Sequence, residues 1–367
     1  MSESSFSYVD VYTKEENVNC FREITTRSNK RLALIFGDLQ WERSLHNGID
    51  DQDDWKPGGT AWHGASAALQ NEFVPIIVST VGDDNSGNDI IKKLNDPSDG
   101  LFGVVTYFVK KKSGETPKYI RIFDGNEKVR YIDPHHINDI EINDIEKPYH
   151  QNSVYASSID LGKDDIIYIF GFQLFRQMFL FELQKKSAEE KNKFIEKYMK
   201  SFVLKNNGKR PTIVFDLAPP DLINEHLTLK DLKIVVEGSN IFIANLSTLL
   251  KFLKDIKDSE IEVCDIDKDS EENISRINEI IKNYRSKIID HFLGTDEDST
   301  LIIRFGVKHL SHILILKRLK KKKVSSDFIR KTYDQDENYK ITKLGFAEQL
   351  MFKYLKGGEE EFERKNK

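Results

Sequence analysis

The stretch from Pro57 to Leu94 limits the possible folds of this chain more than any other stretch. It opens with Gly58-Gly59 and continues with the small residues of 64–68, which allow a helix to pack very closely against a sheet. The β-branched run at 75–81 is typical of a buried strand, and the turn residues at 82–87 supply the start of another helix. A glycine pair lets a backbone and a ligand approach each other without a Cβ between them. The pattern therefore predicts an α/β fold with a ligand near Gly58-Gly59.

Length and composition exclude several classes of protein. A chain of 367 residues with 39% hydrophobic and 31% charged residues has room for one large α/β domain or two small ones and is typical of a soluble protein. Its net charge of −5 argues against broad nucleic-acid binding. Two cysteines, Cys20 and Cys264, cannot form a disulfide framework, which favours a reducing compartment. We find no apolar run of the roughly 18–20 residues that a membrane helix needs and no signal-peptide pattern, so we expect a cytoplasmic protein.

Short apolar runs alternate with helical patterns along most of the chain. This alternation is what a doubly wound parallel sheet with helices on both faces requires. Five strands are expected at its centre, namely 31–36, 76–81, 165–170, 212–215 and 241–244. Residues 300–305 and 313–316 are predicted to form a further strand pair, followed by a last helix.

The stretch described first is similar to the first signature of the ribokinase-like (PfkB) carbohydrate kinases, with Gly-Gly, an alanine-rich helix, a strand and then Val-Gly-Asp-Asp-x-x-Gly at 81–87. Residues 34–43 resemble the first strand and the sugar-contacting turn of this family. Their Gly-Asp-x-x-x-acid-Arg form, together with residues 116–133, is closest to the heptose-phosphate kinase branch. The resemblance covers residues 30 to 356 and is most specific in the first third. It implies the ribokinase-like α/β fold.

In that fold, short strands leave the main sheet and form a small β lid over the sugar. Residues 103–109 and 118–123 are predicted to be two such strands, paired across a Lys-Ser-Gly turn. The expected organisation is an N-terminal extension at 1–29, one domain at 30–358 with lid strands at about 103–132, and a charged tail at 359–367. Lid strands present unpaired edges that proteins usually cover, so we expect a homodimer formed through the lids.

Phosphoryl transfer in this family has three physical requirements. A carboxylate must accept the proton of the attacking hydroxyl, and backbone N–H groups at a helix N-terminus must hold the transferred phosphate. Carboxylates must also hold magnesium near the phosphates, usually through water. The family meets the first two with a Gly-Ala-Gly-Asp motif near the C-terminus and commonly meets the third with Asn-x-x-Glu after a central strand.

The chain departs from the family at the catalytic motif. Counting back from Tyr354, the motif falls on Lys-Leu-Gly-Phe at 343–346 or one residue earlier, which puts Phe346 or Gly345 at the position of the base. Neither residue can accept a proton, and only one of the two glycines is present. A rebuilt loop would have to use one of the nearby acids, Asp334, Asp336 or Glu337.

The nucleotide side departs as well. Asn245 keeps the Asn of Asn-x-x-Glu, but Thr248 stands where the Glu would be. Arg304, two residues before Gly306, stands where the family usually places Thr near the nucleotide phosphate. The resemblance thus assigns Asn245, Arg304 and Gly306 to a nucleotide site that has lost its magnesium carboxylate.

The substrate side keeps more of the family pattern. Glu42 stands where an Asp would bind sugar hydroxyls, or is an exposed turn acid, and Trp62 either stacks on a sugar ring or fills the pocket. Lys118 and Arg121 are either donors to a phosphate or acidic sugar, or solvated cations at a strand edge. The predicted substrate-binding residues are Asp38, Glu42, Gly58, Gly59, Trp62, Lys118 and Arg121.

The sequence therefore favours a pseudokinase that binds a sugar-like ligand, such as a sugar or sugar phosphate, or a protein partner. We expect no cofactor, no metal, no membrane and no nucleic acid; ATP and magnesium belong only to the alternative, an active sugar or nucleoside kinase with a rebuilt loop. A structural dimerising subunit is the third possibility. The basic run 317–323 is interpreted as a solvated turn, with an acidic partner surface as the second interpretation.

Overall fold

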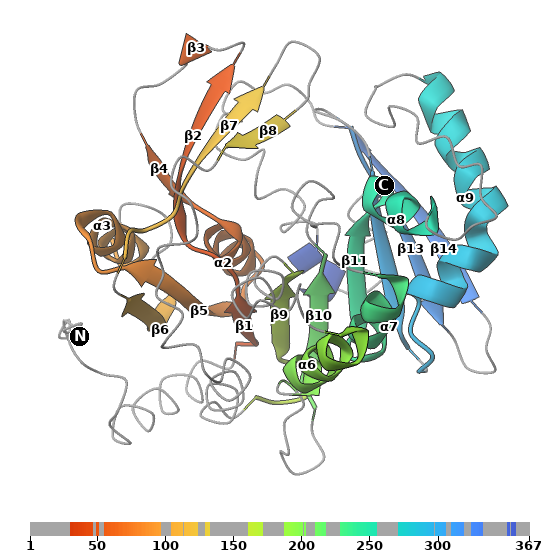
Figure 1. Ribbon diagram of the computed structural model, residues 1–367, viewed down its shortest axis with the longest axis horizontal. Coiled ribbons are helices and arrows are strands. Elements are labelled where there is room, and N and C mark those ends of the chain that lie inside the picture. Colours follow the sequence, from red (N-terminus) through yellow and green to blue (C-terminus); the bar gives the residue numbers. More distant parts are fainter. Residues whose placement is uncertain are drawn as a thin grey trace.

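The computed structural model of the protein describes most of the predicted domain (Figure 1). The described residues are 30–46, 49–50, 55–96, 104–112, 114–123, 129–132, 161–171, 187–200, 202, 210–217, 228–254, 271–296, 298–305, 310–318, 324–332, 351–352 and 354–356. None of the helices among them is both long and apolar enough to cross a membrane.

A nine-stranded sheet in the order β14-β13-β12-β11-β10-β9-β1-β5-β6 forms the centre of the molecule. Its strands are β1 (Leu32–Phe36), β5 (Val74–Gly82), β6 (Val105–Lys112), β9 (Ile166–Phe170), β10 (Thr212–Asp216), β11 (Ile241–Asn245), β12 (Thr300–Phe305), β13 (Leu310–Arg318) and β14 (Val324–Thr332). All neighbours from β6 to β12 pair in parallel, and β13 and β14 are antiparallel. The five predicted central strands are confirmed, as is the fold class.

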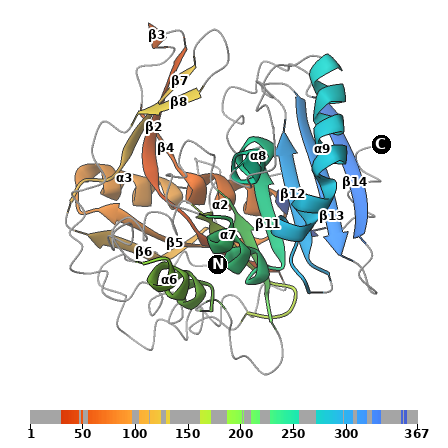
Figure 2. The same ribbon diagram turned by 45° about the vertical axis from the view of Figure 1, so that its right-hand side comes forward.

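Helices cover both faces of this sheet (Figures 1 and 2). They are α2 (Thr60–Gln70), α3 (Asn85–Leu94), α6 (Ala188–Lys200), α7 (Leu229–Glu237), α8 (Leu246–Lys254) and α9 (Glu271–Phe292). Along β1 the even-numbered residues pack in the core cluster of α6, α7, α8 and α9, and the odd-numbered ones pack in that of α2 and α3. Every residue of β1 is buried, which is why a continuous apolar run predicts such a strand.

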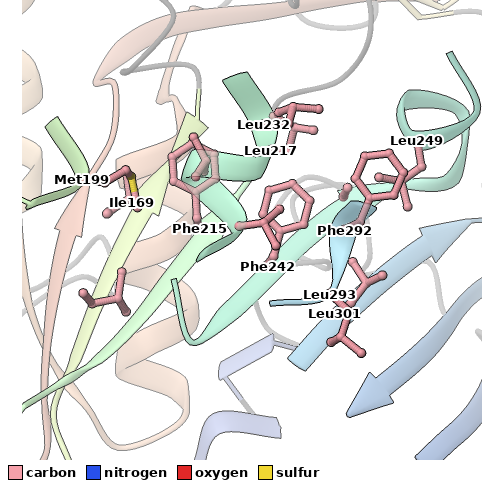
Figure 3. Packing of buried hydrophobic residues seen from close by; sticks show 14 of the residues in the cluster. Ile169, Met199, Phe215, Leu217, Leu232, Phe242, Leu249, Phe292, Leu293 and Leu301 are labelled. Carbon is pink, nitrogen blue, oxygen red and sulfur yellow. The ribbon is translucent and has the colours of Figure 1, made fainter. Parts of the chain in front are cut away.

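Aromatic and aliphatic side chains fill the core between the sheet and α6 to α9. Figure 3 shows Phe215 and Phe242 side by side between strands and helices, and their rings stack with centroids 6.2 Å apart. Met199 of α6 and Phe292 of α9 belong to the same cluster, so helices far apart along the chain share one core.

The last helical segment, within 351–356, completes the opposite face. The Phe352 ring lies 5.3 Å from the Tyr168 ring of β9 and 5.4 Å from the Phe73 ring, measured between centroids. Arg31 fixes the end of the segment, because its Nη1 donates to the Leu355 carbonyl at 2.7 Å and its guanidinium lies 4.7 Å from the Phe73 ring.

A second sheet of five strands forms the predicted lid. Its order is β3-β2-β7-β8, with β4 paired to β2, and its strands are β2 (Gln40–His46), β3 (Ile49–Asp50), β4 (Lys56–Gly58), β7 (Lys118–Phe123) and β8 (Val129–Ile132). Figure 1 shows the lid rising from one edge of the main sheet. The lid position of 118–123 is confirmed, whereas the sequence did not indicate β2, β3 or β4.

The predicted lid strand at 103–109 is wrong. Strand β6 instead extends the main sheet in parallel with β5, and β7 pairs with β2 rather than with β6. The same alternating pattern suits a hairpin strand and the edge strand of a β-α-β unit, and here α3 provides the crossover that makes β5 and β6 parallel. Strand β14 was likewise not predicted.

The close packing of α2 on the sheet gives a first prediction. A Cβ on Gly64 would lie 3.0 Å from Phe170 and 3.4 Å from Ile35, so Gly64→Leu should overpack this face and lower the free energy of unfolding by about 1–3 kcal/mol. Gln70→Leu, at an exposed position of the same helix, is the matched control and should change it little. Urea titration monitored by circular dichroism measures both. Equal stability of the two variants would contradict this packing.

Candidate functional site

The predicted substrate residues lie where the lid meets the main sheet. The strands β1, β5, β9, β10, β11 and β12 are mutually parallel, so their carboxyl ends form one edge. The first lid strand, β2, begins four residues after β1 ends and therefore stands at this edge. Open α/β sheets bind ligands in the crevice outside the carboxyl ends of their strands. The predicted site is thus at the position that the fold favours.

Glu42 is buried at the root of the lid and contacts the start of α2. Its Oε1 accepts hydrogen bonds from the Gly59 N–H at 2.8 Å and from Gln40 Nε2 at 2.7 Å. Its Oε2 lies 3.4 Å from His63 Nε2. Because Gly59 caps the N-terminus of α2, the carboxylate sits at the positive end of the helix dipole. Glu42 is only 7% exposed, which excludes the exposed turn acid considered above.

The glycine pair is required by protein contacts. A Cβ on Gly58 would lie 2.2 Å from the Glu42 carboxyl carbon, and a Cβ on Gly59 would lie 2.2 Å from the Asp38 carbonyl oxygen. Gly59 also has a φ of 96°, a conformation that favours glycine. The sequence correctly indicated close backbone approach here, but the groups that approach are side chain and backbone of this chain. A ligand role for the pair stays a prediction.

Asp38 follows β1 and lies over the start of α2. Its N–H donates to Thr60 Oγ1 at 2.9 Å, and its carbonyl accepts from the Ala61 N–H at 3.0 Å. The side chain is 5% exposed. Burial raises the pKa of the Tyr198 hydroxyl, and the nearby Asp38 charge raises it further. The structure therefore brings Asp38, Glu42, Gly58 and Gly59 together, and their role in binding substrate stays a prediction.

Trp62 is half-buried and packs against the core cluster of α2 and α3. This contact supports the interpretation in which its ring fills space, and stacking on a sugar ring stays a prediction. Lys118 is also half-buried at the start of β7. The side chain of Arg121 lies outside the described residues.

A hydrogen-bond network around Asp84 joins the segment before β7 of the lid to α3. Asp84 caps α3 by accepting from the Gly87 N–H at 2.7 Å, and it also accepts from the Thr116 N–H at 3.0 Å and the Thr116 hydroxyl at 2.6 Å. The Gly82 N–H donates to Thr116 Oγ1 at 3.0 Å. Burial raises the pKa of Asp84, but the hydrogen bonds from Thr116 and Gly87 and the charge of Lys118 outweigh it, so the pKa lies below its usual value.

A second polar cluster lies along the same sheet edge, at β9 to β12. Arg304 Nη1 and Nη2 donate to the two Asp216 carboxylate oxygens at 2.9 and 2.6 Å. The Tyr168 hydroxyl donates to Asp216 Oδ2 at 2.8 Å, and Arg304 Nε donates to Asn245 Oδ1 at 3.2 Å. Burial raises the pKa of Asp216, while Arg304 and Tyr168 oppose that rise.

The structure thus places Asn245 and Arg304 together and adds two residues that the sequence analysis missed; a nucleotide role for these residues stays a prediction. Asp216 ends a buried β-branched strand, and an acid at the carboxyl end of such a strand is a signal that could have been used. Tyr168 lies inside an apolar run and carries no such signal.

Several predicted residues lie outside the described part of the chain. They are Gly306 and the loop acids Asp334, Asp336 and Glu337, together with Gly345 and Phe346 at the expected base position. Their proposed roles stay predictions. Among the described residues, no three His, Cys, Asp or Glu side chains are grouped so as to hold a metal ion.

Comparison with known proteins identifies the fold. No protein-family model and no curated protein matches the chain. Solved carbohydrate kinases are similar to it in structure. A 2-dehydro-3-deoxygluconokinase from Thermotoga maritima has a TM-score of 0.53 and 14% identity, with 89% of this chain and 88% of the other covered.

Two nucleotide complexes are also similar. A ribokinase from Cryptococcus neoformans in complex with ADP has a TM-score of 0.53 and 13% identity over 89% of this chain and 88% of that one. An uncharacterized sugar kinase from Pyrococcus horikoshii in complex with ATP has a TM-score of 0.51 and 16% identity, with 88% of this chain and 82% of the other covered. The chain therefore has the ribokinase-like α/β fold, and its structural neighbours are carbohydrate kinases.

The hydrogen-bond network around Asp84 gives a second prediction. Thr116→Val removes the fully buried hydroxyl that joins Asp84 to Gly82, so the free energy of unfolding at neutral pH should fall by about 1–3 kcal/mol. Because the folded-state pKa of Asp84 is lowered, its contribution exists above the unfolded pKa and is lost as pH falls through the folded pKa.

The variant should therefore lose less stability than the wild type between neutral pH and about pH 3. Urea titrations at several pH values test this, with the half-buried Thr80→Val of β5 as the matched control. If the free energy of unfolding of the variant depends on pH as that of the wild type does, the hydrogen-bond network does not lower the pKa of Asp84.

Proposed function

We propose that this protein is a PfkB-like carbohydrate kinase homologue that binds a sugar-like ligand at the lid without ATP-dependent phosphoryl transfer. The proposal of ligand binding rests on the arrangement of Asp38 and Glu42, which are two buried acids at the junction of the lid, α2 and the sheet edge. Carboxylates at such a junction are suitable acceptors for sugar hydroxyls. The resemblance to the heptose-phosphate kinase branch adds sugar phosphates to the candidate ligands.

The sequence supports the proposed absence of ATP-dependent phosphoryl transfer. The motif position of the general base holds Phe346 or Gly345, and Thr248 replaces the magnesium-site Glu. Loss of a positioned base alone typically lowers a rate by ~10²–10⁴-fold. Loss of the phosphate-binding turn removes electrostatic stabilisation on which phosphoryl transfer largely depends.

A panel of sugars, nucleosides and heptose phosphates with ATP and magnesium tests this proposal, with ADP release as the readout. We expect no turnover above background, while a thermal-shift screen of the same compounds should find a ligand that stabilises the wild type. Glu42→Gln should weaken that shift, and Gln70→Leu, remote from the site, should leave it unchanged.

The alternative kinase with a rebuilt loop makes the opposite prediction. Robust ADP release that disappears in the Asp334→Ala, Asp336→Ala, Glu337→Ala triple variant would establish that alternative and refute the pseudokinase proposal. Absence of both turnover and ligand binding would favour the structural subunit instead.

We also propose that the lid joins two copies of the chain. Strands β3 and β8 end the order of the lid sheet among the described residues, so each has one edge without a neighbouring strand there. Such edges are usually covered in natural proteins, and a two-fold dimer is the commonest way for identical chains to do so. Sedimentation equilibrium at tens of micromolar should show a dimer, and a strict monomer would contradict the proposal.

A further inference from the structure

The Asp216–Arg304 pair occupies the middle of the sheet edge at which an open α/β fold binds its ligands. Asp216 ends β10, Asn245 ends β11, and Arg304 lies one residue before the end of β12. These three strands are neighbours in the sheet. Asn245 pairs directly with Arg304, and Asp216 pairs with Ile243, two residues earlier on β11, so Arg304 has to reach back to Asp216 across β11. Their hydrogen bonds decide what kind of ion this edge can accept.

Both oxygens of the Asp216 carboxylate already accept hydrogen bonds from within the chain. One oxygen accepts from Arg304 Nη2 at 2.6 Å, and the other accepts from Arg304 Nη1 at 2.9 Å and from the Tyr168 hydroxyl at 2.8 Å. A bidentate guanidinium matches a carboxylate in shape and charge. The pair is buried, with side-chain exposures of 4% for Asp216 and 15% for Arg304, so little solvent screens it.

Two further oxygen ligands among the described residues of this edge are occupied or enclosed too. Asn245 Oδ1 accepts from Arg304 Nε at 3.2 Å, so the guanidinium faces the amide oxygen as well. Thr248, in the first turn of α8, is completely buried. Magnesium requires near-octahedral oxygen ligands, usually including one or two carboxylates. The described residues of this edge do not fit that requirement, because the Arg304 guanidinium lies among the candidate ligands.

We infer that Arg304 is a built-in cation that closes the sheet edge at β10 to β12 to divalent metal ions. The inference deepens the proposed function and rests on it only in taking this edge as the nucleotide side. Arg304 neutralises Asp216 from within the chain, and a second cation would meet electrostatic repulsion at a few ångströms. Any anion that binds here would do so without a bridging metal.

The aromatic core holds this arrangement in place. The Tyr168 ring is fully buried and stacks on Phe352, and its centroid also lies 4.7 Å from that of Phe170. Its hydroxyl therefore has a fixed position from which it donates to Asp216. The ion pair is held from both sides, by Tyr168 on β9 and by Asn245 on β11.

Manganese binding followed by electron paramagnetic resonance tests the inference without reference to turnover. The wild type and Asp216→Asn should bind Mn²⁺ equally, because Asp216 holds no metal in the wild type and its removal therefore costs no metal ligand. Arg304→Met exposes the carboxylate and should bind Mn²⁺ at least about tenfold more tightly than the wild type. The gain should disappear in the double variant Arg304→Met, Asp216→Asn.

Two results with the wild type and these variants would overturn the inference. One is Mn²⁺ binding by the wild type that Asp216→Asn abolishes, and the other is the absence of any gain in a folded Arg304→Met variant. If Arg304→Met does not fold, since it leaves a buried carboxylate unpaired, the comparison of the wild type with Asp216→Asn decides. Arg304→Lys keeps a cation near Asp216 and should gain no Mn²⁺ binding; a gain there would also count against the inference.

The outcome is separable from that of the proposed function. ADP release by the wild type without Asp216-dependent Mn²⁺ binding would refute the pseudokinase proposal and leave the role of Arg304 intact. Asp216-dependent Mn²⁺ binding without ADP release would refute only the role of Arg304.

Discussion

The contact between Glu42 and the N-terminus of α2 is the interaction on which the candidate site depends. One buried carboxylate accepts from the Gly59 N–H and from Gln40, and it faces His63. This contact ties the first lid strand to the helix, and the helix in turn packs its small side chains on the main sheet. The absence of a Cβ at Gly58 and Gly59 is the condition that permits it. The walls of the site are therefore set by the fold before any ligand arrives.

The sheet edge has two halves with different electrostatic character. At the lid, Asp38 and Glu42 are two buried acids that follow β1, and Asp84 is a third acid that follows β5. At β10 to β12, the acid at the carboxyl end of β10, Asp216, is paired with Arg304. The first half is rich in hydrogen-bond acceptors, which suits a ligand with many hydroxyl groups. In the second half the charges of Asp216 and Arg304 cancel, so this half exerts little attraction on an external cation.

Sequence reasoning identified the central strands because parallel strands buried on both faces are continuous apolar runs. It could not place β6 correctly, since the side-chain period of two is the same in a lid hairpin and in a sheet edge. It also indicated the glycine pair without identifying its partner, Glu42. The pairing of Asp216 with Arg304 joins residues 88 positions apart, and only the order of the strands brings them together.

The position of the last helical segment has a consequence for how the chain acquires its structure. Arg31 directly precedes the first strand, and its contact with Leu355 spans 324 positions, close to the longest loop that this domain can close. Phe352 covers Tyr168 and Phe73, which were made far earlier during synthesis. During translation Phe352 can cover these two rings only after the roughly 180 residues that follow Tyr168 have been made, and apolar surface exposed during synthesis promotes aggregation. The contacts of the 351–356 segment therefore form late in synthesis and join the two ends of the described domain.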